Sequence, residues 1–173
     1  MYKDKRVIHI VACQEDGGIG INNDLLYHIK EDLKFFREQT LGHALLMGRK
    51  TVESLPKPLD RRVVFCISSE ISNRSEKFSY KSMSLESSLN VGYWQSNQLK
   101  TDKIFVCGGG QLYQSTFDIT DELWITQIKG DKEADTFYHI PDNFEMFQCG
   151  NWLESKNPYG EVTLYRFTKW KRK

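Results

Sequence analysis

The chain has 173 residues, which is long enough to bury a substantial core and close to the size of one typical domain. Its 24 basic and 23 acidic side chains are mixed along the sequence and give a formal net charge of +1, so no extended field of one sign exists to attract nucleic acid or an anionic membrane. No apolar run approaches the roughly 20 residues that cross a bilayer. We therefore expect one cytoplasmic domain, residues 1–173, that binds neither nucleic acid nor membrane.

Four short apolar runs in the first two thirds of the chain are predicted to be strands. They cover residues 6–13, 43–48, 62–69 and 103–109. Nearly continuous apolar composition is typical of parallel strands that are buried on both faces. Helices are predicted between them at 28–39, 49–55, 84 to about 93, and 110–117. This alternation of strands and helices predicts an α/β fold with a mostly parallel sheet.

The final third has a different pattern. Aromatic strand-like segments follow one another without helices at 121–128, around 144–152, and at 161–170. Such segments predict antiparallel strands. The polar segments 68–80 and 92–102 are interpreted as surface connections. The complete prediction is a single α/β domain with a central, mostly parallel eight-stranded sheet, antiparallel C-terminal strands and about four flanking helices.

The four cysteines form no CxxC pair. Cys13, Cys66 and Cys107 lie inside apolar strand-like runs. We interpret the cysteines as buried, reduced thiols and expect no metal site.

The first predicted helix carries a charge on its apolar face. Ile29, Asp32, Leu33 and Phe36 follow the spacing of residues on one side of a helix. A carboxylate there is explained either by escape to solvent near a helix end or by a buried basic partner. The functional alternative is that Asp32 binds the amidine-like edge of a flat heterocycle through two hydrogen bonds.

Two strand-to-helix junctions contain glycine. In LLMGRKTVESL (45–55), Arg49, Lys50 and Thr51 begin the helix, where basic residues oppose the helix dipole and are better explained by a bound anion than by ordinary surface charge. In FVCGGGQLY (105–113), three glycines allow backbone N–H groups to approach a phosphate, although a tight turn would also require glycine. Together the junctions predict an extended ligand with several phosphates, such as a dinucleotide.

These segments resemble dihydrofolate reductase, in order and spacing, over essentially the whole chain. The resemblance depends on IVAC followed by GGIGINN (17–23), Asp32 in its helix, MGRKTVESL, RRVVFCISS, and VCGGGQLY with the later DELWITQI and ADTFY (134–138). It implies NADPH-dependent reduction of dihydrofolate to tetrahydrofolate, by hydride transfer to C6 and protonation of N5. It also implies binding of antifolate inhibitors and a monomeric state.

The resemblance implies a role for individual residues toward the substrate. Asp32, with Thr126 nearby, would bond the 2-amino group and N3 of the pterin, and Tyr27 would form part of its wall. Arg62 would pair with the glutamate carboxylate of the folate tail, with Arg61 as the alternative. The other residues implied in substrate binding are Ile10, Ala12, Leu33, Phe36, Leu55, Leu59 and Cys107.

A second set would bind the cofactor. A cis peptide bond would join Gly108 and Gly109, as in the family, and the loop Gln14 to Asp24 would close over the nicotinamide. The implied cofactor-binding residues are Ala12, Ile19, Gly20, Gly48, Arg49, Lys50, Thr51, Ser68, Ser69, Gly108, Gly109, Gly110, Gln111, Leu112 and Tyr113.

The chain departs from the family before the helix that bears Asp32. Leu25, Leu26 and Tyr27 stand where the usual pattern is Leu-Pro-Trp, so the backbone loses a rigid residue and an indole N–H is replaced by a phenol. We expect retained activity with altered turnover and an altered response to diaminopyrimidine antifolates. Gln111 occupies a position that is often basic in relatives, so the strength of the preference for NADPH over NADH stays open.

Two other functions are considered. The pyrimidine reductase domain of riboflavin synthesis shares the fold and the glycine junction, but that family lacks the helix signature around Asp32. A catalytically silent relative could bind NADPH or folate as a regulatory or RNA-binding module. The balanced charge argues against RNA, and the complete set of anchor residues argues against loss of catalysis.

Overall fold

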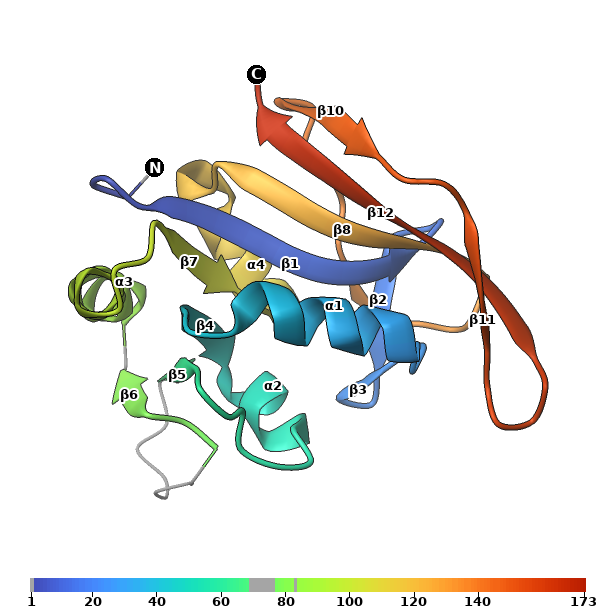
Figure 1. Cartoon of the computed structure of the whole chain (residues 1–173), viewed down its shortest axis with the longest axis horizontal. Coiled ribbons are helices and arrows are strands. Elements are labelled where there is room, and N and C mark those ends of the chain that lie inside the picture. The colour runs from blue at the N-terminus through green and yellow to red at the C-terminus, as the bar shows by residue number, and fades with distance from the viewer. Residues whose placement is uncertain (1, 69–76, 83) are drawn as a thin grey trace. The chain divides into compact units, whose positions relative to one another are not determined.

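The computed structural model describes residues 2–68, 77–82 and 84–173. The chain divides into two compact units, one formed by Met1–His9 and Thr40–Asp121 and the other by Ile10–Gln39 and Glu122–Lys173. Strand β1 (Arg6–Gln14), drawn in blue in Figure 1, contributes residues to both units. The expectation of a single domain over residues 1–173 stays a prediction.

The first unit contains the parallel strands. Residues Arg6–His9 of β1 pair with β7 (Lys103–Val106), which pairs with β4 (Ala44–Gly48). Strand β4 pairs with β5 (Val63–Ile67), and β5 pairs with β6 (Tyr80–Ser82). All four pairings are parallel, and the side chains of Ala44–Met47 and Ile104–Val106 are buried. Burial on both faces explains the continuous apolar runs, and the predicted parallel arrangement is confirmed.

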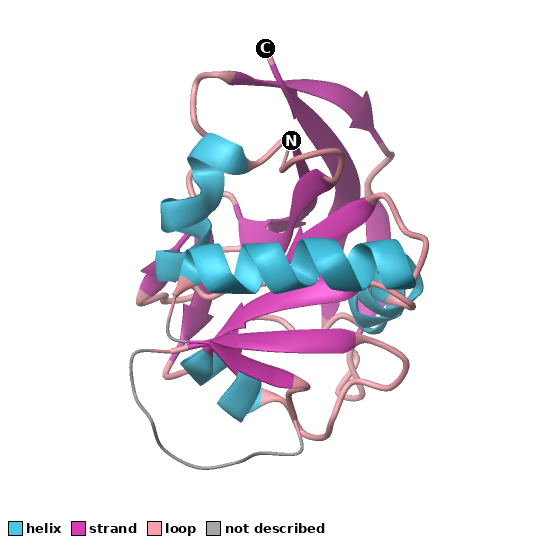
Figure 2. Cartoon of the chain, turned by 90° about the vertical axis from the view of Figure 1, so that its left-hand side faces the viewer, coloured by secondary structure: helices cyan, strands magenta, loops and turns pink. Residues whose placement is uncertain are grey.

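Three helices of this unit follow strands. Helix α2 (Arg49–Ser54) begins directly after β4, α3 (Leu85–Gln98) precedes β7, and α4 (Gly110–Thr116) begins at the third of the three consecutive glycines (Figure 2). A short 3-10 helix, Phe117–Ile119, continues α4. The side chain of Ser84 caps α3 by accepting a hydrogen bond from the Ser87 N–H at 3.1 Å.

Helix α3 is longer than the sequence predicts. The prediction placed its end near Tyr93 and interpreted 92–102 as a surface connection, which is wrong for residues up to Gln98. Its buried face is made partly of small residues, Ser88, Gly92 and Ser96. A Cβ atom at Gly92 would lie 3.9 Å from Leu46 Cδ2. Small residues allow close packing here, but they do not produce the apolar periodicity by which a helix is recognised.

The second unit contains the antiparallel strands. Strand β12 (Val162–Arg172) pairs antiparallel with β8 (Glu122–Lys129), β10 (Phe144–Cys149) and β11 (Leu153–Lys156). The predicted antiparallel C-terminal strands are confirmed. The stretch 144–152 was predicted as one strand and forms β10 followed by a break at Gly150, whose N–H donates to the Phe167 carbonyl.

The α/β class and the number of helices agree with the prediction. Helix α1 (Lys30–Thr40) is the fourth α-helix among the described residues. In the same residues, the central sheet has eight strands that pair one after another, and a further strand, β11, pairs with β12. A separate three-stranded sheet joins β2 (Gly18–Ile21) to β3 (Asp24–Leu25) and β9 (Thr136–Phe137). The segment predicted as a loop, 14–24, therefore contains strand structure. No helix of the described residues is long and apolar enough to cross a membrane.

All four cysteines are free thiols. Cys13 and Cys66 are buried, as predicted, and Cys107 is partly buried. Cys149 is exposed, so the prediction of burial is wrong for it. It ends β10, a strand in which only Phe144 is buried.

A buried histidine belongs to the core of the first unit. His9 is 0% exposed, and its Nε2 lies 2.7 Å from Thr116 Oγ1. The Thr116 hydroxyl donates to the Leu112 carbonyl at 2.7 Å, so it accepts from His9 Nε2–H. The imidazole also packs against the rings of Tyr113 and Phe117. Burial lowers the pKa of His9 to about 3.

This histidine makes stability depend on pH. Because the pKa of His9 falls from 6.5 when unfolded to about 3 when folded, its contribution is present above pH 6.5 and is lost as the pH falls toward 3. We expect the free energy of unfolding of the natural protein to fall, between pH 6 and pH 4, more steeply than that of His9→Gln by about 1.4 kcal/mol per pH unit. Urea unfolding at several pH values measures both slopes. Parallel curves would contradict the prediction.

Candidate functional site

Asp32 lies in the first turn of α1, which begins at Lys30 and not at His28 as predicted. Its Oδ1 accepts a hydrogen bond of 2.5 Å from Thr126 Oγ1. Thr126 lies on β8 and is 2% exposed. The structure thus brings together two predicted catalytic residues that are 94 positions apart in the chain.

The carboxylate of Asp32 has no positively charged partner within the described part of the chain. Burial raises its pKa, and the hydrogen bond from Thr126 opposes this effect to a smaller extent. A buried basic partner therefore does not explain the charge on this helix face. A carboxylate in this position can accept further hydrogen bonds from two adjacent N–H groups of a planar ligand.

Tyr27, which stands where the family has Trp, is held by two residues that the sequence analysis missed. Its hydroxyl donates to Gln14 Oε1 at 2.9 Å, and Gln14 Nε2 donates to the Lys132 carbonyl at 2.6 Å. Lys132 Nζ lies 4.4 Å from the centre of the Tyr27 ring and donates to the Leu26 carbonyl. The three segments are far apart in the sequence, so no local pattern indicates this network. It fixes the phenol and satisfies its hydroxyl.

The predicted apolar face of α1 is divided between core and surface. Ile29 is buried with Ile128 and Tyr165, whereas Leu33 is 46% exposed and Phe36 is partly buried. Exposed Leu33 is available to a ligand.

Other residues predicted for the ligand lie nearby in the second unit. A small pocket is lined by Ala12, Ile19 and Tyr27, among others. Ile10 is buried in β1, and Gly20 pairs with Leu25 in the three-stranded sheet. The structure thus brings Ala12 and Ile19 together with Tyr27.

The two glycine junctions of the first unit touch through their backbones. The Gly48 N–H donates to the Gly108 carbonyl at 2.7 Å. A Cβ atom at Gly109 would lie 3.3 Å from Thr51 Oγ1, and one at Gly108 would lie 3.3 Å from the Tyr113 ring. The Gly108–Gly109 peptide bond is cis, as predicted, and Gly108 has a φ of 104°. Side chains would crowd this surface, so the glycines leave a backbone cradle that fits a phosphate-bearing ligand.

The basic residues beside this cradle differ in their surroundings. Arg49 Nη1 bonds both carboxylate oxygens of Glu53, at 3.0 and 3.1 Å, while Lys50 is exposed. Lys77 Nζ also donates to the Glu53 carbonyl at 2.9 Å. Arg49 therefore has a partner one turn away in the same helix. A phosphate would have to share the Arg49 guanidinium with Glu53 or displace the Glu53 carboxylate.

Two other regions were predicted to contact the cofactor, the end of β5 and the start of α4. Ser68 is buried after β5, and Ser69 lies outside the described residues. Gly110 begins α4, in which Gln111 is exposed and Leu112 and Tyr113 are buried.

The two arginines proposed for the folate tail are in different environments. The side chain of Arg62 is 4% exposed, pairs with Asp60 Oδ1 at 3.0 Å, and donates to Thr40 Oγ1 at 3.3 Å. Arg61 is exposed and has a φ of 54°. Arg62 is thus the fixed guanidinium, although a ligand carboxylate would have to compete with Asp60.

Three other substrate residues belong to the first unit. Leu55 and Leu59 are partly buried. The Cys107 N–H donates to the Leu46 carbonyl, and burial raises the pKa of the Cys107 thiol far above its ordinary value. Cys107 is therefore an uncharged thiol.

Known proteins that are similar to this chain are dihydrofolate reductases. Residues 6–172 match the family model described as dihydrofolate reductase. A dihydrofolate reductase of Mycoplasma genitalium is 35% identical over 138 residues, covering 78% of this chain and 83% of the relative. That of Bacillus subtilis is 32% identical, covering 95% and 93%, and that of Staphylococcus aureus is 33% identical, covering 85% and 86%.

Proposed function

The chain belongs to the dihydrofolate reductase family, and we propose that it reduces 7,8-dihydrofolate to 5,6,7,8-tetrahydrofolate with NADPH, by hydride transfer to C6 and protonation of N5. The observation that carries this proposal is the carboxylate of Asp32, which is hydrogen-bonded to Thr126 and has no cation beside it among the described residues. The product would serve one-carbon metabolism and thymidylate synthesis. A monomeric state and a cytoplasmic location remain part of the prediction.

Asp32 would hold the pterin. Its two oxygens match the two N–H groups that a 2-aminopyrimidinone edge presents, and Thr126 orients the carboxylate from β8. Because burial makes the anion costly, a ligand that brings N–H donors and positive character is bound preferentially. As N5 is protonated, the positive charge on the pterin grows, and the Asp32 anion stabilises it. The proton would come from water.

The same carboxylate would bind inhibitors. A diaminopyrimidine offers a similar pair of N–H donors, so antifolates of this class would compete with dihydrofolate at Asp32.

The glycine cradle fits NADPH in its chemistry. When bound, NADPH supplies the hydride. Gly108 and Gly109 would receive its phosphates through backbone N–H groups, because no side chain occupies that surface. Gly48, whose own N–H bonds the Gly108 carbonyl, would allow the cofactor to approach the backbone closely. Arg49, Ser68 and Ser69 would bind the 2′-phosphate of the adenosine, with Ser69 outside the described residues. Thr51, Gly110 and Gln111 would bind the pyrophosphate region. The remaining proposed contacts are those of Ala12, Ile19, Gly20, Lys50, Leu112 and Tyr113.

A spectroscopic assay tests this function. Purified protein is mixed with NADPH and dihydrofolate, and the loss of near-UV absorbance is followed, with NADH in a parallel reaction. Rapid oxidation that requires dihydrofolate is expected. If the pyrimidine substrate of riboflavin synthesis is reduced instead, the related reductase is the correct assignment. Binding of NADPH without oxidation by either substrate would identify a silent relative.

Tyr27→Trp tests the departure from the family pattern. The larger indole would disturb the contacts with Gln14 and Lys132, so we expect a loss of about 1–3 kcal/mol in stability and at least a threefold change in turnover and in inhibition by trimethoprim. Urea unfolding and steady-state inhibition measure these effects. Unchanged kinetics and inhibition would show that Tyr27 substitutes for the indole without consequence.

A further inference from the structure

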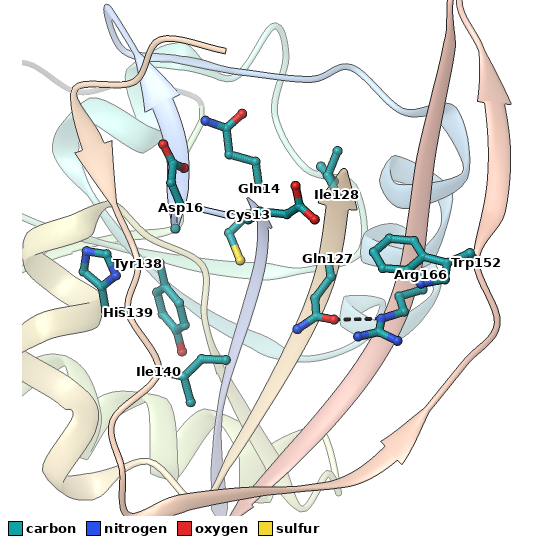
Figure 3. A pocket seen from close by; sticks show the side chains of 12 residues that line it. Cys13, Gln14, Asp16, Gln127, Ile128, Tyr138, His139, Ile140, Trp152 and Arg166 are labelled. Carbon is teal, nitrogen blue, oxygen red and sulfur yellow. Dashed lines mark hydrogen bonds between the residues drawn. The ribbon is translucent and has the colours of Figure 1, made fainter. Parts of the chain in front are cut away.

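A second pocket, of about 360 Å³, lies in the second unit and is lined by residues of β8 and β12, among others. Thr126 faces Asp32, and successive side chains of a strand point to opposite faces. Gln127 therefore faces away from Asp32 and lines this pocket, together with Arg166 from β12 (Figure 3). The roles proposed above for the substrate and the cofactor do not use Gln127 or Arg166.

One wall of the pocket carries a fixed set of hydrogen-bond donors. Gln127 and Arg166 are direct cross-strand neighbours, and Arg166 Nε donates to Gln127 Oε1 at 2.8 Å. The guanidinium carbon of Arg166 also lies 4.5 Å from the ring centre of Trp152, which stacks against it. Within the described residues, the Arg166 Nη groups and the Gln127 Nε2 group donate to no acceptor. A planar guanidinium with an amide donor beside it suits a carboxylate.

The opposite wall carries negative charge. Asp16 lies across the pocket from Arg166 (Figure 3), and Glu15 also lines it. Asp16 Oδ1 accepts a hydrogen bond from the Gly18 N–H at 2.8 Å, whereas Glu15 is exposed and has no partner among the described residues. A simple anion would be repelled by these two acids. A ligand with a cationic group at its far end would be attracted by them.

The lining also includes aromatic and apolar side chains. Tyr138 is 3% exposed, and Ile140 and Trp152 are partly buried. These side chains can contact the two faces of a flat, apolar body.

We propose that this pocket binds a small zwitterion with an aromatic body, whose carboxylate pairs with Arg166 and Gln127 and whose ammonium group faces Glu15 and Asp16. The pocket and its charges are properties of the second unit alone, so the proposal does not depend on the function proposed above.

The probe is 4-(aminomethyl)benzoate, which carries the two charges at opposite ends of one ring. Titration into ¹⁵N-labelled protein is followed at the indole N–H signal of Trp152, assigned by comparison with Trp152→Phe. We expect saturable shifts in the low millimolar range. Arg166→Gln should weaken binding at least about tenfold, since it removes the charge-assisted hydrogen bonds. Lys171→Gln, which removes a cation from the same strand outside the pocket, should leave binding unchanged.

Three further arms make the test decisive. Benzylamine, which lacks the carboxylate, should bind at least about tenfold more weakly. Glu15→Gln changes an exposed side chain, so the variant should fold normally. It should weaken binding of the zwitterion severalfold. Arg62→Gln should have no effect, because Arg62 is not among the residues that line this pocket.

The proposal is overturned if Trp152 does not shift with probe up to about 20 mM, a range that covers any useful affinity. Equal binding by Arg166→Gln, or by benzylamine, would also overturn it, as would loss of binding in Arg62→Gln. If circular dichroism shows that Arg166→Gln is unfolded, the benzylamine and Glu15→Gln results decide.

Discussion

Asp32→Asn lowers the turnover of dihydrofolate by about 100-fold or more and at the same time raises the free energy of unfolding at pH 7. Activity falls because the amide has no charge to stabilise the protonated pterin. Stability rises because burial raises the pKa of Asp32 in the folded protein. The stabilising contribution of this group is thus present below its unfolded pKa of 3.8 and is lost as the pH rises through the folded value.

Steady-state kinetics and urea unfolding at several pH values measure the two effects. The gain in stability of Asp32→Asn over the natural protein should shrink as the pH is lowered. Glu31→Gln is the matched control, because Glu31 is an exposed acid in the same helical turn that accepts a hydrogen bond from Ser155 Oγ at 2.7 Å. This hydrogen bond lowers the pKa of Glu31, so its removal should slightly destabilise the protein and leave turnover within about threefold. Joint loss of activity and stability in Asp32→Asn would make Asp32 a structural residue.

Gly108→Ala weakens NADPH binding by at least about tenfold and lowers the free energy of unfolding by about 1–3 kcal/mol. Its φ of 104° is unfavourable for a side chain, and the new methyl group would lie 3.3 Å from the Tyr113 ring, beside the contact with Gly48. Displacement of this backbone would disturb the surface that we propose for the phosphates. Fluorescence titration with NADPH and urea unfolding measure the two effects.

Gly42→Ala separates strain from crowding. Gly42 also has a positive φ, 74°, but a Cβ atom there would have no neighbour within 4 Å. Gly42→Ala should therefore lose some stability while it keeps its affinity for NADPH. Equal NADPH affinity in folded Gly108→Ala and Gly42→Ala would show that the Gly108 junction does not bind the cofactor.

The sequence predicted features that are local in origin. Continuous apolar runs identified β4, β5 and β7, and the later aromatic runs identified the antiparallel strands. Burial of one or both faces of a strand produces a recognisable spacing of apolar residues along the sequence. Asp32 was recognised as anomalous because it interrupts such a period. The helix α3 was predicted too short because Gly92 and Ser96 are buried without being apolar.

By itself, then, the sequence determined the α/β class, the glycine junctions, and the unusual acid in its helix, since each depends on neighbouring residues. Only the tertiary structure decided which distant side chains meet. Thr126 reaches Asp32, and Gln14 and Lys132 hold Tyr27, because the fold brings separate segments of the chain together. Arg166 lies opposite Gln127 because the pairing and register of β8 and β12 place it there. A shift of one residue in register would turn each strand side chain to the other face, and no local pattern specifies that choice.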